Sequence, residues 1–153
     1  MAIDPHRRVL VVDDDPSCRG MLSTVLRAND LTVDEAADGV EALQLIAVNQ
    51  YAVILLDLMM PRLDGFGVIE ALGRTEEGQP VVLVVTGADR AAIEQLDPRR
   101  IHGIVRKPFD LQELASVVVA CAEIRGRNAF STMAIAAIVA GSPFLALIKS
   151  SWS

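Results

Sequence analysis

Five polar side chains that could together perform phosphoryl chemistry each follow a short apolar run. They are Asp13, Asp14, Asp57, Thr86 and Lys107. Carboxylates gathered in one cleft repel one another unless a cation lies among them, and hard oxygen ligands suit Mg²⁺. A carboxylate can also be the nucleophile in phosphoryl transfer, which gives an aspartyl-phosphate. A lysine ammonium and a threonine hydroxyl would then stabilise the charge that builds on the transferred group.

These side chains need a fold that brings the ends of several strands together. Three runs are apolar throughout and rich in β-branched residues, which is typical of strands buried on both faces of a parallel sheet. Since sites in such folds form at the carboxyl ends of the strands, the polar side chains are expected to converge at one edge. The three runs are Val9–Val12, Ala52–Leu56 and Val81–Val85, and two less apolar candidates are Leu31–Ala36 and Ile101–Arg106.

Amphipathic stretches with apolar residues at three- and four-residue steps lie between the strand candidates. Helices are expected to begin at Pro16, Gly39, Gly65 and Asp110, with Asp15 as the cap before Pro16. The alternation of strands and helices predicts an α/β fold, in which a doubly wound, five-stranded parallel sheet carries helices on both faces.

Charge divides the chain into two parts. The 20 Asp and Glu residues outnumber 14 Lys and Arg, and this net charge of −6 argues against direct binding of nucleic acid. All acidic residues precede residue 127, and no residue from Asn128 to Ile148 is charged. We therefore predict a globular domain at 7–125 and an apolar, helical C-terminal tail at 126–153.

The remaining features favour a reduced, cytoplasmic protein. The N-terminus has no apolar run that could serve as a secretory signal. Cys18 and Cys121 form no metal or disulfide pattern and are expected to be buried on the inner faces of helices. His6 and His102 are expected at the surface, away from the acidic cluster.

Four segments carry a resemblance to a known family. VLVVDDDP, ILLDLMMPRLDGF, VVTGA and RKPFD occur in this order, and together they resemble the receiver domain of bacterial two-component response regulators. The resemblance covers Arg8 to Ile124. It implies a flavodoxin-like fold of the receiver type and a signalling phosphoacceptor, which is not an enzyme acting on a separate substrate.

The same resemblance assigns roles to the acidic residues. Asp57 is implied to be the phosphoacceptor. Asp13, Asp14 and Asp57 are implied to hold Mg²⁺, with the backbone carbonyl of Met59 as a further ligand.

The resemblance also assigns roles beyond the carboxylates. Thr86 is implied to be the switch hydroxyl, Lys107 to contact the phosphoryl group, and Pro108 to follow a cis peptide bond. Receivers often carry Tyr or Phe three residues before the lysine, where this chain has Ile104. Because Ile104 supplies no ligand, we expect the chemistry to survive, whereas the usual coupling of the threonine to an aromatic rotamer is not expected.

The resemblance implies a sensor histidine kinase or a histidine phosphotransfer protein as partner, and a homodimer stays open. The alternative is a non-phosphorylated receiver-fold module that docks through its last helices. Two enzyme classes with similar architecture do not fit. A dehalogenase-like phosphatase needs an aspartate where Met59 stands, and a flavodoxin-like carrier needs a phosphate-binding loop where Asp13–Asp15 stand.

Three interpretations of the tail stay open. Residues 129–148 match the roughly 20 residues that span a bilayer, and Arg125 and Arg127 before them would keep the domain in the cytoplasm. Their many alanines and Gly141–Pro143 fit equally a helix that packs on a partner. The tail could also derive from a non-native reading frame or a truncated output module. It is too short, and too poor in basic residues, for a helix-turn-helix.

Overall fold

The computed structural model describes residues 4–73 and 79–126. Five strands form one parallel sheet in the order β2-β1-β3-β4-β5. The strands are β1 (Arg8–Val12), β2 (Thr32–Ala36), β3 (Val53–Leu56), β4 (Val81–Thr86) and β5 (Gly103–Arg106). The helices are the 3₁₀ turn η1 (Pro5–Arg7), α1 (Pro16–Ala28), α2 (Gly39–Val48), α3 (Gly65–Leu72), α4 (Arg90–Glu94) and α5 (Leu111–Gly126).

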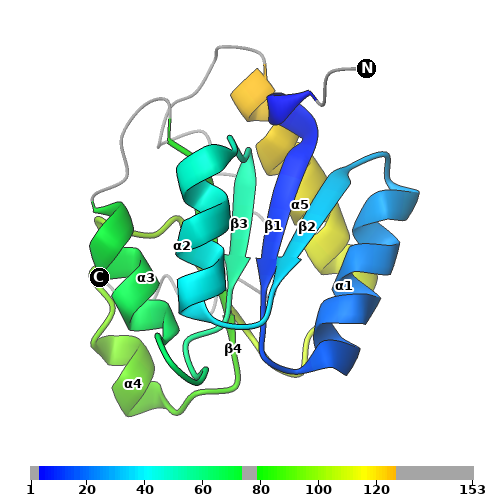
Figure 1. Ribbon diagram of the computed structural model, residues 1–153. Helices are drawn as coiled ribbons and strands as arrows, with labels where there is room; N and C mark the ends of the chain where they lie inside the picture. The colour runs from blue at the N-terminus through cyan, green and yellow to red at the C-terminus, as the bar shows by residue number, and fades with distance from the viewer. Residues whose placement is uncertain (1–3, 74–78, 127–153) are drawn as a thin grey trace.

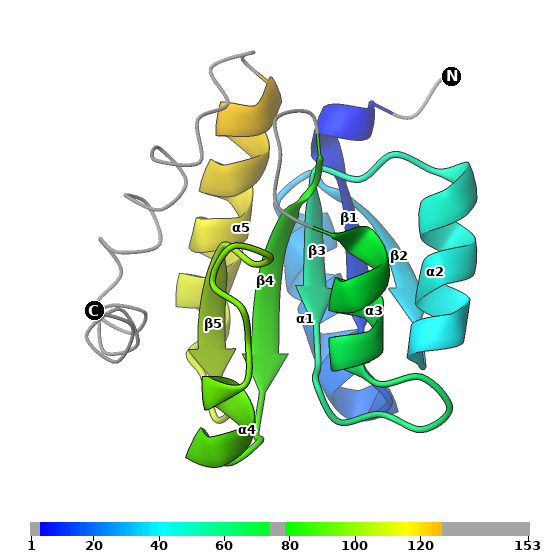
Figure 2. The same ribbon diagram turned by 90° about the vertical axis from the view of Figure 1, so that its left-hand side faces the viewer.

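Helices cover both faces of the sheet. In Figures 1 and 2, α1 and α5 lie on one face, while α2, α3 and α4 lie on the other. Side chains of β1 alternate between the two apolar cores, with Val9 and Val11 under α1 and α5, and Leu10 and Val12 under the other helices. Burial on both faces explains why the strand sequences are apolar throughout. The predicted doubly wound α/β fold is confirmed.

Aspartate side chains cap the first four α-helices. The carboxylate of Asp15 accepts a hydrogen bond from the N–H of Ser17, which confirms the predicted cap before Pro16. The other predicted helix starts agree with the structure to within one residue, since Asp110 directly precedes α5. The remaining caps are Asp38 for α2, Asp64 for α3 and Asp89 for α4.

The expectation that His102 lies at the surface is wrong. His102 is buried. Its imidazole Nδ1 accepts a hydrogen bond from the backbone N–H of Val82, and its backbone N–H donates to the Val82 carbonyl. The imidazole therefore extends the pairing of β4 with β5 by one residue. His6 is exposed, and Cys18 and Cys121 are both buried, as expected.

The predicted tail lies, from residue 127 onward, outside the described residues, and so does the candidate span at 129–148. Within residues 4–73 and 79–126, no helix is both long and apolar enough to cross a membrane. The domain boundary at 125, the helical tail and the membrane anchor stay predictions.

Candidate functional site

Two carboxylates leave neighbouring strands at the same edge of the sheet. The N–H of Asp13 donates to the carbonyl of Ala36, and the N–H of Asp57 donates to the carbonyl of Val12, so the sheet pairing fixes both residues. Strand β1 has β2 on one side and β3 on the other, so the strand order reverses at β1. Sites in open α/β sheets form at such a switch point. Asp13 and Asp57 are buried, whereas Asp14 is exposed.

The acidic residues and the lysine form one cluster, as the sequence predicts. Asp13, Asp14 and Asp57 each offer a carboxylate oxygen, and these oxygens lie within 4.8 Å of one another. The Nζ of Lys107 donates to Asp13 Oδ2 at 2.7 Å and to Asp57 Oδ2 at 3.2 Å. An all-oxygen donor set of this kind fits a hard divalent cation such as Mg²⁺.

Burial and charge act in opposite directions on the ionisation of this cluster. Burial raises the pKa of Asp57 above its ordinary value, although the charge of Lys107 works against this rise. Burial alone would lower the pKa of Lys107, but its hydrogen bond to Asp13 and the charge of Asp57 raise it. The lysine is therefore firmly charged at neutral pH.

Thr86 and Lys107 are held next to each other at the ends of β4 and β5. Thr86 is fully buried, and its carbonyl accepts a hydrogen bond from the N–H of Lys107 at 2.9 Å. The Thr86 hydroxyl accepts a hydrogen bond from the N–H of Ala88. The peptide bond before Pro108 is cis, as expected. Ile104 lies in β5, fully enclosed in the core under α2, α3 and α4.

The loop between β3 and α3 carries Met59, whose N–H lies 3.4 Å from Asp57 Oδ1 and whose side chain is exposed. The loop closes on itself, because the N–H of Gly65 donates to the carbonyl of Leu58. A Cβ at Gly65 would collide with the backbone carbonyl of Asp57, so only glycine permits this close approach.

We expect a Gly65→Ala variant to lose about 2 kcal/mol of unfolding free energy, because the added methyl must displace the backbone next to Asp57. Urea denaturation measures this loss. Gly20 offers a matched control, since it lies inside α1 and an added Cβ would meet no atom within 4 Å. Gly20→Ala should gain roughly 0.5 kcal/mol. A Gly65→Ala variant as stable as the natural chain would refute the close approach.

Two residues beside the cluster were not singled out by the sequence for this site. The Nη1 of Arg19 donates to the backbone carbonyl of Asp13 at 2.6 Å, and its Nε donates to Glu35. Burial, together with a hydrogen bond to Asp13, raises the pKa of the Cys18 thiol to about 11. Both residues lie in the first turns of α1, so the predicted helix start at Pro16 was the signal that could have placed them near Asp13.

Comparison with known proteins identifies the family. The sequence model of the response regulator receiver domain matches residues 9–119. Together with the sheet topology and the acidic cluster, this match shows that the chain belongs to the response regulator receiver domains of two-component systems. Phosphorylation on aspartate and use of Mg²⁺ are general features of this family.

Individual relatives agree with this assignment. Response regulator MprA of Mycobacterium sp. (strain KMS) is 42% identical over an alignment of 114 positions, which covers 70% of this chain and 46% of MprA. The chain thus spans about half the length of that relative. The receiver domain of the Francisella response regulator 1452 superposes with a TM-score of 0.67 at 34% identity, covering 76% of this chain and 97% of that chain. Response regulator TrrA of Thermotoga maritima, in complex with Mg²⁺-BeF, gives a TM-score of 0.66 at 28% identity, covering 75% and 98%.

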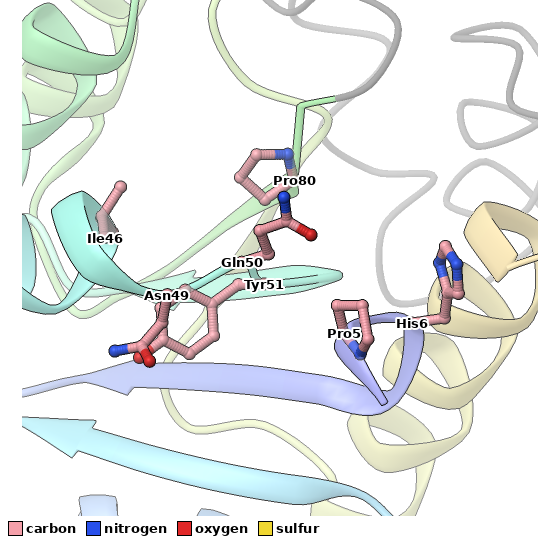
Figure 3. Close-up of a pocket in the computed structure, with 7 residues that line it drawn as sticks. All are labelled: Pro5, His6, Ile46, Asn49, Gln50, Tyr51 and Pro80. Carbon is pink, nitrogen blue, oxygen red and sulfur yellow. The ribbon is translucent and has the colours of Figure 1, made fainter. Parts of the chain in front are cut away.

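A cavity of about 210 Å³ lies at the opposite, amino-terminal ends of the strands, where Tyr51 precedes β3 and Pro80 precedes β4 (Figure 3). Figure 3 shows that η1 contributes Pro5 and His6 to its rim. No residue of the acidic cluster lines this cavity. The candidate site is therefore the carboxyl edge of the sheet.

Proposed function

We propose that the chain accepts a phosphoryl group on Asp57. The observation that carries this proposal is the position of Lys107, whose ammonium bridges the two buried carboxylates of Asp13 and Asp57. A fixed positive charge beside Asp57 lies where negative charge would build on a transferred phosphoryl group. Membership of the receiver family supports the same chemistry.

The proposed donor is a phosphohistidine of a sensor histidine kinase or a phosphotransfer protein in the cytoplasm. A carboxylate oxygen of Asp57 forms the new O–P bond while the P–N bond breaks, and the imidazole leaves with the electron pair of that bond and takes up a proton. The Thr86 hydroxyl, which already accepts from Ala88, still has its own hydrogen to donate to a phosphoryl oxygen.

Mg²⁺ is the proposed cofactor. The three carboxylates of Asp13, Asp14 and Asp57 suit it in number and chemistry, and the Met59 carbonyl is the proposed fourth protein ligand. When bound, the ion neutralises negative charge on the phosphoryl oxygens. Lys107 supplies the second positive charge from the carboxyl end of β5, at the same edge of the sheet.

The domain organisation belongs to the same proposal. We assign residues 7–125 to the receiver unit, because the family match at 9–119 and all described strands lie inside this range. Residues 126–153 are assigned to a separate apolar segment, which begins at the last residue of α5.

Intact mass after incubation with acetyl phosphate tests the phosphoacceptor chemistry. We expect one added phosphoryl group in the presence of Mg²⁺ and none after chelation. Borohydride reduction converts an aspartyl-phosphate into homoserine, and peptide mapping should then place the change at Asp57. An unmodified mass in a protein that circular dichroism shows to be folded would favour the non-phosphorylated interaction module instead.

A further inference from the structure

The loop that carries Met59 is joined to a neighbouring turn of the chain. The N–H of Gly39, at the start of α2, donates to the carbonyl of Leu63 at 2.9 Å. A Cβ on Gly39 would collide with that same carbonyl, so the turn between β2 and α2 lies directly against the loop between β3 and α3. Figures 1 and 2 show this loop passing beneath the end of α2 where that helix begins.

An ion pair fastens the two segments. The Nε and the Nη2 of Arg62 each lie 2.8 Å from Oδ2 of Asp38. Oδ1 of the same carboxylate caps α2 by accepting a hydrogen bond from the N–H of Glu41. The hydrogen bond from Arg62 holds the pKa of Asp38 below its ordinary value, so the carboxylate stays charged at neutral pH.

The backbone at Arg62 is unusual. Its φ of +65° lies in the left-handed region, which L residues other than glycine, asparagine and aspartate rarely adopt. Such a conformation persists where the surroundings hold it in place. The side chain of Arg62 is more than half exposed, and its described contacts are those to Asp38. The ion pair is therefore the side-chain contact that opposes relaxation at this residue, in addition to the backbone hydrogen bonds to the carbonyls of Leu58 and Leu63.

We propose that Asp38 and Arg62 are positioning residues for the metal site, which fix the loop that carries the Met59 carbonyl. The inference rests on the proposed function, since it assumes that this carbonyl is a ligand. Neither residue belongs to the acidic cluster that would hold the ion. Arg62 lies three residues after Met59, and Asp38 holds it in place. In other metal sites, residues that contact the ligands orient them in the same way.

For Arg62, charge alone and loss of positioning predict opposite changes in the affinity for Mg²⁺. Arg62 is a cation on the loop next to the site, so removing its charge should, if anything, favour binding of Mg²⁺. Weaker binding after its removal must then come from lost positioning. Removing the charge of Asp38 disfavours a cation by either route, so Arg62 is the more informative position.

The experiment is a Mg²⁺ titration of the full chain, followed through the amide signals of the loop by NMR. The variants are Arg62→Gln, Asp38→Asn, which keeps an oxygen to cap α2, and the double variant. We expect Mg²⁺ to bind about tenfold more weakly in each single variant, the lower end of the usual effect of residues behind metal ligands. The double variant should bind Mg²⁺ no more weakly than the weaker-binding single variant, because the two residues act as one pair. Arg62→Lys should recover part of the loss. Phosphorylation by acetyl phosphate should need more Mg²⁺ and reach the natural rate at saturation.

Asp97 and Arg99 provide a matched control. They form an exposed bidentate ion pair of the same residue types, with bonds of 3.0 Å, in the segment before β5 at the far end of the sheet. Arg99→Gln should leave Mg²⁺ affinity unchanged. If Arg62→Gln also binds Mg²⁺ as the natural chain does, the positioning role is refuted while the phosphoacceptor proposal stands. If the natural chain itself binds no Mg²⁺, the proposed metal site fails, and this inference fails with it.

Discussion

Asp57→Asn is expected to abolish phosphorylation while leaving the fold more stable than that of the natural chain. The carboxylate oxygen that would form the O–P bond becomes an amide oxygen of much lower nucleophilicity, so no phosphoryl group should be added. The amide keeps the shape of the side chain and an acceptor for the N–H of Met59. Lys107 retains its hydrogen bond to Asp13. Intact mass with acetyl phosphate and Mg²⁺ measures the loss.

The gain in stability has a defined dependence on pH. Burial raises the pKa of Asp57 above its ordinary value. A raised carboxyl pKa means that the fold favours the neutral acid, so ionisation of Asp57 costs stability as the pH rises through the folded pKa. The difference between Asp57→Asn and the natural chain should be small near pH 3 and should grow toward pH 7. Thermal denaturation at both values, without Mg²⁺, measures it, and a variant that is less stable at pH 7 would contradict the burial argument.

Lys107→Met is expected to slow phosphorylation by acetyl phosphate about 10²-fold to 10³-fold, the usual effect of removing one group that stabilises charge in a transition state. The methionine keeps the length of the side chain but removes the ammonium that bridges Asp13 and Asp57. Binding of Mg²⁺ should survive, because lysine and the ion compete for the same carboxylates. Rates measured at saturating Mg²⁺ separate the loss of the ammonium from a change in affinity.

The same variant should also lose stability at neutral pH. Two buried carboxylates would remain without their shared cation, and breaking such a pair costs about 2 kcal/mol when the lysine is a quarter exposed. Lys107 is also the first of the groups that lower the pKa of Asp57, so this pKa should rise further in the variant. The deficit should therefore shrink in acid, where Asp57 becomes neutral. Lys107→Arg, which keeps the charge, is the control, and an undiminished rate in Lys107→Met would exclude the lysine from the chemistry.

Much of this site could be predicted because its parts lie at the ends of strongly patterned strands. The apolar runs before Asp13, Asp57 and Thr86 are buried on both faces. Short runs that are apolar at every position are typical of strands in a parallel sheet, so the type of element could be predicted. Once the strands are parallel, their carboxyl ends share one edge. The meeting of the carboxylates with Lys107 then follows from topology alone.

Other contacts had no pattern that could reveal them. Asp38 and Arg62 are separated by 24 positions, and nothing in either segment marks them as partners. The burial of His102 could not be predicted, because a single histidine before a short strand has no periodicity that indicates whether its side chain faces the core. Its position depends on the N–H of Val82, which lies on the neighbouring strand. Such contacts depend on how two loops or strand ends meet, which hydrophobic patterning does not encode.

The contacts of Lys107 span 94 positions to Asp13 and 50 to Asp57, so the site joins the first described strand of the domain to the last. Contacts of this kind contribute no stability until the loops that separate them have closed, and domains rich in such contacts fold slowly. Small single domains usually fold in one cooperative step. During refolding from urea, competence for phosphorylation and the helical circular dichroism should therefore recover together.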